Sequence, residues 1–208
     1  MVEKPVVVVT GASKGLGLAI TKILLEEFNA VVVALSRSQN PGMAELHKAH
    51  HDSLLLLECD VTDATALKSS ISQAAVKYQR LDALILNAGV LEPMGTIVSQ
   101  GFTARTPLCR TIAQEESDVT FVALRPGMVD TSMQALVRGK GALSMKEEDH
   151  LKFMNVHATG QLVKPEDAGY VAAALSLQAP SDLSGQFLSW DSEICKDYWR
   201  GCIMKTTE

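Results

Sequence analysis

The segment VVVVTGASKGLGLAI, residues 6–20, decides the fold. Four consecutive valines are typical of a short strand that is buried on both faces of a parallel sheet. The glycines Gly11, Gly15 and Gly17 follow in the spacing T-G-x-x-x-G-x-G, directly before a helix-forming stretch. Glycines permit a tight turn and a close approach of the backbone, and a helix N-terminus offers free N–H groups to phosphate. The segment therefore predicts a turn that binds a dinucleotide pyrophosphate, although glycines also occur in turns for purely conformational reasons.

The rest of the chain alternates short apolar runs with helical stretches. The runs predicted as strands are Val6–Val9, Ala30–Leu35, Leu54–Leu57, Ala83–Leu86, Thr120–Leu124 and Gly185–Trp190. The stretches predicted as helices are Leu16–Glu27, Met43–His51, Ala64–Tyr78 and Pro165–Leu177, and residues 132–163 form either a mobile flap or a pair of short helices. This alternation predicts an α/β fold with a doubly wound parallel sheet. Without a linker or repeat, we expect a single Rossmann-type domain over residues 1–208.

Composition excludes several classes of function. A length of 208 residues with 47% hydrophobic and 21% charged residues is typical of a compact soluble domain. A net charge of -5 and a pI near 5.6 argue against nucleic-acid binding. No apolar run is long enough for a membrane span or a signal peptide, so no membrane association is expected. Four cysteines without a C-x-x-C pair indicate reduced thiols and a cytoplasmic location.

Charged residues after the strands bear on the choice of cofactor. The second predicted strand ends in Ser36-Arg37 without the acidic residue that would bind ribose hydroxyls, and Arg37 suits a 2′-phosphate instead. Lys14 adds a second positive charge in the glycine turn. Together they favour NADP(H) over NAD(H), although each could be an ordinary solvated charge. Asp60, after the third strand, either accepts from the adenine amine or caps the following helix.

Four motifs in this order and spacing carry a resemblance: TGASKGLG at residues 10–17, CDV at 59–61, NAG at 87–89 and RPGMVDT at 125–131. They resemble those of the short-chain dehydrogenase/reductase family, and the surrounding sequence is most similar to the sepiapterin-reductase and benzil-reductase-like branch. The resemblance covers residues 5–95 and 108–190. It implies NADP(H) as cofactor and a small-molecule carbonyl or dicarbonyl substrate that is reduced by hydride transfer.

The same resemblance implies a role for each matching position. The cofactor-binding residues would be Thr10, Gly11, Ser13, Lys14, Gly15, Leu16 and Gly17 at the phosphates, Arg37 at the 2′-phosphate, Asp60 and Val61 at the adenine, Asn87 and Gly89 at the ribose, and Pro126, Gly127, Val129 and Thr131 at the nicotinamide. No metal site is predicted, because His47, His50 and His51 lack a further ligand and are better explained as a solvated helix face.

The chain departs from the family pattern at its catalytic centre. Family members carry a Tyr-x-x-x-Lys motif whose phenol donates a proton to the carbonyl oxygen. Here no tyrosine occurs between Tyr78 and Tyr170, and no lysine between Lys77 and Lys140, so no catalytic residue is assigned. We expect a weakly active or inactive oxidoreductase. The alternatives are a non-catalytic NADP(H)-binding or sensing protein, and a truncated or splice product of an active reductase.

The spacing of the motifs predicts that one central βα unit is missing. Val119 lies only 32 positions after Asn87, which is enough for one crossover. A helix from Thr106-Pro107 to about Glu115 is predicted to form it, which gives six strands in the order 3-2-1-4-6-7. Family members pair subunits through the helix that carries the missing motif, so a homo-oligomer is possible but doubtful.

Overall fold

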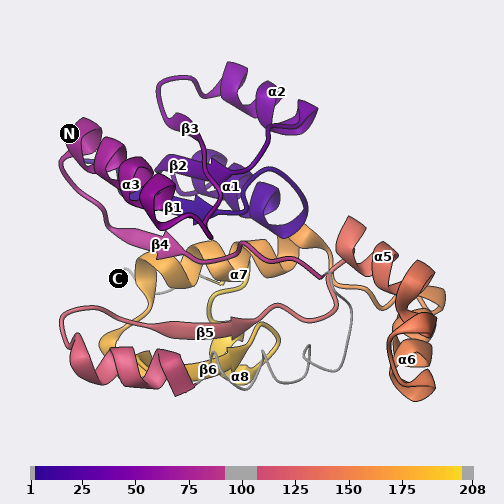
Figure 1. The fold of residues 1–208 in the computed structure, drawn as a ribbon. Coiled ribbons are helices and arrows are strands. Elements are labelled where there is room, and N and C mark those ends of the chain that lie inside the picture. Colours follow the sequence, from indigo (N-terminus) through magenta and orange to yellow (C-terminus); the bar gives the residue numbers. More distant parts are fainter. Residues whose placement is uncertain (1–2, 92–106, 203–208) are drawn as a thin grey trace. The chain divides into compact units, whose positions relative to one another are not determined.

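The computed structural model describes residues 3–91 and 107–202 of the chain (Figure 1). They form two compact units that divide between Gly89 and Val90. The first unit holds the glycine-rich segment, and the second holds the RPGMVDT motif. The single domain predicted over residues 1–208 stays a prediction.

The first unit is built on a four-stranded parallel sheet in the order β3-β2-β1-β4. Its strands are β1 (Val6–Thr10), β2 (Val31–Ser36), β3 (Leu54–Glu58) and β4 (Ala83–Ile85). Its helices are α1 (Gly15–Glu26), α2 (Pro41–Ala49) and α3 (Ala64–Tyr78). In the register of the central strand, Val7 lies beside Val32 on one side and Ala83 on the other. The predicted order 3-2-1-4 is therefore confirmed.

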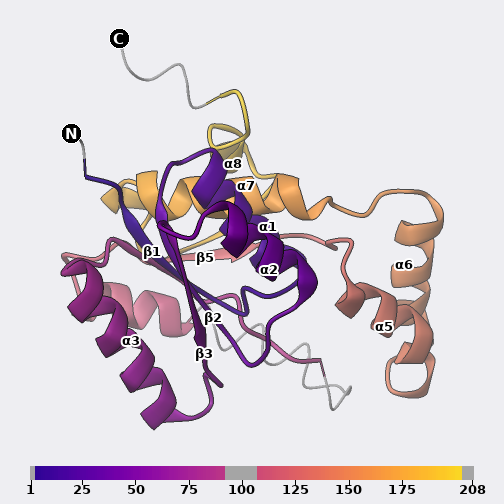
Figure 2. The same cartoon turned by 90° about the horizontal axis from the view of Figure 1, so that it is seen from above.

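Both faces of this sheet are covered, which explains the uninterrupted valines of β1. Figure 2 shows α3 on one side of the strands and α1 and α2 on the other. On the α3 side, Val6, Val8 and Val33 pack in one cluster with Ala74. Every residue of β1 is buried, and burial of a valine side chain stabilises the fold by about 1.5 kcal/mol or more.

The second unit contains two parallel strands and several helices. Residues 107–115 are helical and are followed by β5 (Val122–Arg125), α5 (Ser132–Lys140), the 3-10 turn η1 (Gly141–Leu143), α6 (Glu147–Ala158), α7 (Pro165–Gln178), the 3-10 turn η2 (Ser181–Leu183), β6 (Gln186–Ser189) and α8 (Glu193–Lys196). Val171, Leu188 and Cys195 belong to its core cluster, beside partly buried Trp190. The predicted helix ending near Glu115 is thus present in the described residues, and 132–163 contains a pair of short helices.

The step from β4 to β5 in the predicted order 3-2-1-4-6-7 joins the two units and stays a prediction. Within the second unit, β5 pairs in parallel with β6, as that order predicts.

No helix in the described part of the chain is both long enough and apolar enough to span a lipid bilayer.

Candidate functional site

The glycine turn, residues 11–17, connects β1 to α1 and adopts conformations that favour glycine. Gly11 and Gly15 have φ angles of 65° and 54°, in the left-handed region. The first residues of α1 follow at once, and Lys14, in the N-cap position, makes no side-chain hydrogen bond to the helix end. A phosphate can therefore reach the first N–H groups of α1 and the positive end of its dipole.

Two glycines of this turn have no room for a side chain. A Cβ atom on Gly17 would lie 2.2 Å from the carbonyl oxygen of Gly11 and 2.6 Å from Nδ2 of Asn87. A Cβ atom on Gly11 would lie 2.8 Å from Cα of Ala88. The glycine spacing of the sequence is thus a steric requirement of three chain segments that meet here. The result is a surface of bare backbone of the kind that a pyrophosphate needs.

Asn87 and Thr10 hold the end of β4 against the turn. The Asn87 side chain donates from Nδ2 to the carbonyl oxygens of Thr10 at 3.1 Å and Gly11 at 3.2 Å. The Thr10 hydroxyl accepts from the backbone N–H groups of Asn87 and Ala88, both at 3.0 Å, and donates to the Ile85 carbonyl at 3.4 Å. Thr10 is buried and its hydroxyl is fully bonded, so it supports the turn and offers no polar group to a ligand.

The loop between β2 and α2 carries Arg37, whose side chain is exposed. Its neighbour Ser36 donates from its hydroxyl to the carbonyl of Ser38 at 3.1 Å. At the end of the loop, Asn40 caps α2 by accepting from the Met43 N–H at 2.9 Å, and its Nδ2 donates to the carbonyl of Ser13 in the glycine turn. The structure therefore joins the loop with Arg37 to the turn with Lys14. Sequence reasoning missed Asn40, although an Asn followed by Pro is a helix-start signal.

Asp60 sits in its own tight turn at the end of β3. Its Oδ1 accepts from the backbone N–H of Thr62 at 3.0 Å and from the Thr62 hydroxyl at 2.8 Å. These hydrogen bonds, aided by the charge of Arg37, lower the pKa of Asp60, which keeps it ionised. The residue that caps α3 is Asp63, which accepts from Thr65 and Ala66. Asp60 therefore does not cap α3, and of the two roles considered for it the contact with adenine stays a prediction.

The other predicted cofactor-binding residues of the first unit lie in the loops that follow the carboxyl ends of its strands. Ser13 and Leu16 belong to the glycine turn, Val61 follows Asp60, and Gly89 follows Asn87. Parallel strands bring their carboxyl ends to one edge of a sheet, which is where open α/β sheets bind ligands. The register of β1 with β2 and β4 places the ends of these strands level.

The predicted nicotinamide residues follow β5 in the second unit. Gly127 has a φ of 80°, and a Cβ atom there would lie 2.9 Å from both Nε1 of Trp190 and Cγ2 of Val163. Pro126 precedes it, and Val129 forms a parallel bridge with Val163. Thr131 caps α5 by accepting from the Gln134 N–H at 3.5 Å. These residues are therefore held by local packing, and the Pro-Gly pair is more than a surface turn.

The three histidines His47, His50 and His51 lie at the C-terminal end of α2. In the described parts of the chain no group of three or more His, Cys, Asp or Glu could hold a metal ion, and His50 lies instead 3.8 Å from the Glu26 carboxylate.

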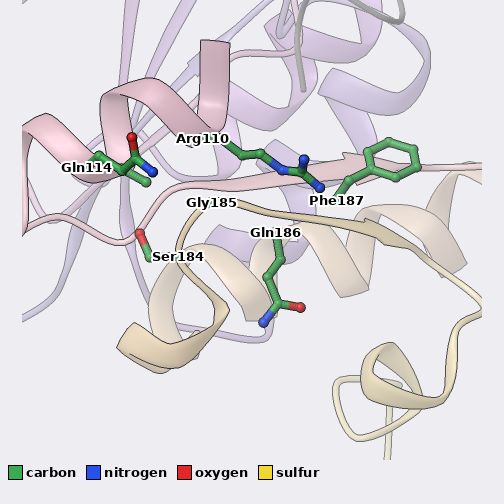
Figure 3. Close-up of a pocket in the computed structure, with 7 residues that line it drawn as sticks. Arg110, Gln114, Ser184, Gly185, Gln186 and Phe187 are labelled. Carbon is green, nitrogen blue, oxygen red and sulfur yellow. The ribbon is translucent and has the colours of Figure 1, made fainter. Parts of the chain in front are cut away.

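A groove of about 520 Å³, which contains no predicted site residue, lies between helical residues 107–115 and β6. Figure 3 shows Arg110 and Gln114 entering it from the helix, with Gln186 and Phe187 on opposite sides of β6.

Comparison with known proteins identifies the family. A model described as short chain dehydrogenase matches residues 5–104. An uncharacterized oxidoreductase of Schizosaccharomyces pombe is 32% identical over 242 aligned positions, which cover 90% of this chain and 96% of that protein. The chain belongs to the short-chain dehydrogenase family. The alignment is longer than the 208 residues of this family member, so the chain skips part of that relative.

Other relatives and solved structures agree. A benzil reductase of Saccharomyces cerevisiae, named as (S)-benzoin forming, is 25% identical over 253 positions, 90% of this chain and 96% of that protein. The crystal structure of the KRED1-Pglu enzyme has a TM-score of 0.80 at 28% identity and covers 89% of this chain and 100% of that one. A short-chain dehydrogenase/reductase from Saccharomyces cerevisiae has a TM-score of 0.84 at 24% identity, over 94% of this chain and 99% of that one, and shares the fold. This short-chain dehydrogenase thus has the Rossmann-type fold of its family.

Proposed function

We propose that this chain binds NADP(H) and reduces a carbonyl or dicarbonyl compound only weakly. The observation that carries the proposal is the bare backbone surface of the glycine turn, where Gly17 and Gly11 leave no space for a Cβ atom. Such a surface, next to an open helix N-terminus, has the chemistry that a pyrophosphate requires. The exposed charges of Lys14 and Arg37 favour the phosphorylated dinucleotide.

Each part of the cofactor has candidate partners. Backbone N–H groups at Gly11, Ser13, Gly15 and Leu16 would hold the phosphates, and Arg37 the 2′-phosphate. Asp60 with Val61 would hold the adenine, and Asn87 with Gly89 the ribose. In the second unit, Pro126, Gly127, Val129 and Thr131 are the candidates for the nicotinamide. When bound, NADPH supplies a hydride, and the residues of this chain bind and orient it.

The missing component of the reaction is a proton donor. Reduction of a carbonyl adds a hydride to carbon and a proton to oxygen, and the family motif that delivers the proton has no counterpart between residues 79 and 139. Loss of a general acid costs a factor of about 10²–10⁴ in rate. We therefore expect turnover to be slow, with water as the proton source.

The class of substrate is proposed from the relatives. The alignment with the benzil reductase covers most of both chains, which favours an aromatic or aliphatic 1,2-diketone. Free thiols at all four cysteines support the proposed cytoplasmic location. The gap in the alignment with the fission yeast relative supports a chain that has lost a block, for which a longer transcript encoding Tyr-x-x-x-Lys between codons 95 and 108 is the direct test.

The proposal is tested by two measurements on the purified 208-residue chain. Titration with NADPH, followed by the fluorescence of the nicotinamide, is expected to saturate. Oxidation of NADPH in the presence of benzil is then expected to run at least 100-fold more slowly than with the yeast benzil reductase under the same conditions. Binding without detectable turnover would favour the non-catalytic alternative, and absence of saturation would refute NADP(H) binding. Turnover equal to that of the yeast enzyme would refute the proposed loss of the acid.

A further inference from the structure

We propose that Asn40 is a positioning residue that holds the loop of residues 37–40, which carries Arg37, against the glycine turn, and thereby sets the preference for NADPH over NADH. This inference rests on the proposed function. It names the contact that makes the proposed cofactor site selective for NADPH. Asn40 lies outside the motifs that carry the family resemblance.

The side chain of Asn40 makes two bonds in different directions. Its Oδ1 accepts from the Met43 N–H at 2.9 Å and caps α2, while its Nδ2 donates to the carbonyl of Ser13, 27 residues earlier. Ser, Asp and Asn are about equally favourable as caps. A serine oxygen in the capping position has no second polar atom that faces Ser13, and an aspartate has no N–H donor. Capping alone therefore does not require an asparagine here, whereas the bond across to the turn does.

Two further contacts place the loop beside the turn. Before Arg37, the Ala12 N–H of the turn donates to the carbonyl of Leu35 at 3.3 Å. After Arg37, Gly42 lies so close to α1 that a Cβ atom would be 3.2 Å from Cδ2 of Leu18. The chain on both sides of Arg37 is thus attached to the turn and to α1, and the Asn40 amide supplies a side-chain hydrogen bond to that attachment after Arg37.

The charges of the two segments oppose their close approach. Lys14 lies next to Ser13, and Arg37 lies three residues before Asn40, so the bond brings together two segments that each carry an exposed cation. Neither cation forms a salt bridge with another described residue. Like charges repel, the Asp60 carboxylate near Arg37 offsets part of this repulsion, and the bond between neutral groups offsets a further part. Without the bond, Arg37 moves away from the turn, which weakens the binding of a 2′-phosphate and leaves NADH unaffected.

The test compares Asn40→Ser, which keeps a cap for α2 and loses the bond to Ser13, with Asn40→Ala, which loses both. The dissociation constants of NADPH and NADH are measured for each variant by fluorescence titration. For Asn40→Ser we expect NADPH to bind on the order of tenfold more weakly, as for the loss of one hydrogen bond, with NADH unchanged within twofold. In an Arg37→Ala background, Asn40→Ser is expected to have no further effect on the NADPH to NADH ratio, which a merely destabilising substitution would not produce.

A measurement without cofactor separates the two proposals. Hydrogen exchange in residues 11–17 and 36–40 of the unliganded protein is expected to be several-fold faster in Asn40→Ser than in the wild type. If the wild type binds NADPH and Asn40→Ser changes neither the exchange nor the ratio of dissociation constants, the inference is overturned and the proposed function stands. If the wild type binds neither dinucleotide, the proposed function fails together with the role in selectivity, and the exchange rates alone decide whether Asn40 holds the loop.

Discussion

At the scale of single residues, the candidate site depends on glycines at positions where no side chain fits. Gly17 is buried, and its Cα approaches the carbonyl of Gly11 so closely that any side chain would displace a backbone group. Gly139, near the end of α5, serves as its counterpart, because a Cβ atom added there would meet no other atom within 4 Å. The two glycines are chemically identical, and only their surroundings decide what a methyl group does there.

For Gly17→Ala we expect loss of NADPH binding and a decrease of about 1–3 kcal/mol in the free energy of unfolding, because the turn must open to admit the methyl group. Urea denaturation and NADPH titration check this. Gly139→Ala is expected to stabilise the protein slightly, by about 0.5–1 kcal/mol, and to bind NADPH as the wild type does. Normal binding by Gly17→Ala would show that the turn is not the phosphate site.

Asp82 connects the segment before β4 to the start of β1 and gives the first unit a pH-dependent component. Its carboxylate accepts two hydrogen bonds from Arg80, at 2.9 and 2.7 Å, and one from the Val6 N–H at 2.7 Å. The bonds from Arg80, followed by that from Val6, lower the pKa of Asp82 below its ordinary value of 3.8. A group with a lowered pKa in the folded state stabilises the fold above its unfolded pKa, and this contribution is lost as the pH falls through the folded value.

Asp82→Asn is therefore expected to lower the free energy of unfolding by about 1 kcal/mol at pH 7, with a difference from the wild type that shrinks steadily as the pH falls below about 4. Urea denaturation at a series of pH values measures it. Asp52→Asn is the control, because that side chain is 89% exposed and its removal should cost less than about 0.5 kcal/mol at any pH. A constant difference between Asp82→Asn and the wild type down to pH 3 would contradict the role of the charge.

At the scale of the elements, two aspartates near the start of α3 have different roles. Asp63 closes the first turn of α3, while Asp60, three residues earlier, is bonded to Thr62 and faces the charge of Arg37. Asp63→Ala is expected to cost about 1 kcal/mol of stability and to leave the affinity for NADPH unchanged. Asp60→Ala is expected to weaken NADPH binding several-fold with a smaller effect on stability. Thermal denaturation and fluorescence titration of both variants check the contrast, which would be contradicted by equal effects on binding.

Much of each element could be predicted from local sequence. Consecutive valines are typical of a strand buried on both faces, and β1 lies close to its predicted range. A proline is favourable in the first turn of a helix, and α7 begins at Pro165 as predicted. Contacts between segments that lie far apart in the sequence could not be predicted in this way, because they depend on how two segments pack and not on the composition of either one. The hydrogen bond from Asn40 to Ser13 is such a contact. Only the capping role of Asn40 has a signal in the local sequence.

At the scale of the whole molecule, the proposed phosphate and adenine contacts and the expected position of the catalytic motif lie in different parts of the sequence. The turn, the loop with Arg37 and the end of β4 all lie before residue 90, and the missing Tyr-x-x-x-Lys would lie after it. A change that removes the catalytic motif can therefore leave the residues before position 90 intact. This division is the basis for expecting a ligand effect on stability in a chain for which we propose slow turnover.

NADPH at 100 times its dissociation constant is expected to raise the free energy of unfolding by about 2.7 kcal/mol, because only the folded chain binds it. The measurement is the thermal midpoint with and without NADPH, at a fixed protein concentration. NADH at the same concentration is expected to give a smaller shift, and Arg37→Ala should remove the difference between the two nucleotides. Equal shifts from NADPH and NADH in the wild type would contradict the assignment of Arg37 to the 2′-phosphate.

The hydrogen bonds around Thr10 also have a kinetic consequence. Because the Thr10 hydroxyl and the Asn87 amide already fix the turn from both sides, the chain loses little further conformational freedom when a dinucleotide arrives. Encounter is then governed by diffusion and by attraction between the nucleotide's phosphates and the cations beside the turn. We therefore expect the association of NADPH to be fast, on the order of 10⁷ M⁻¹s⁻¹ or above, and to slow as added salt screens that attraction.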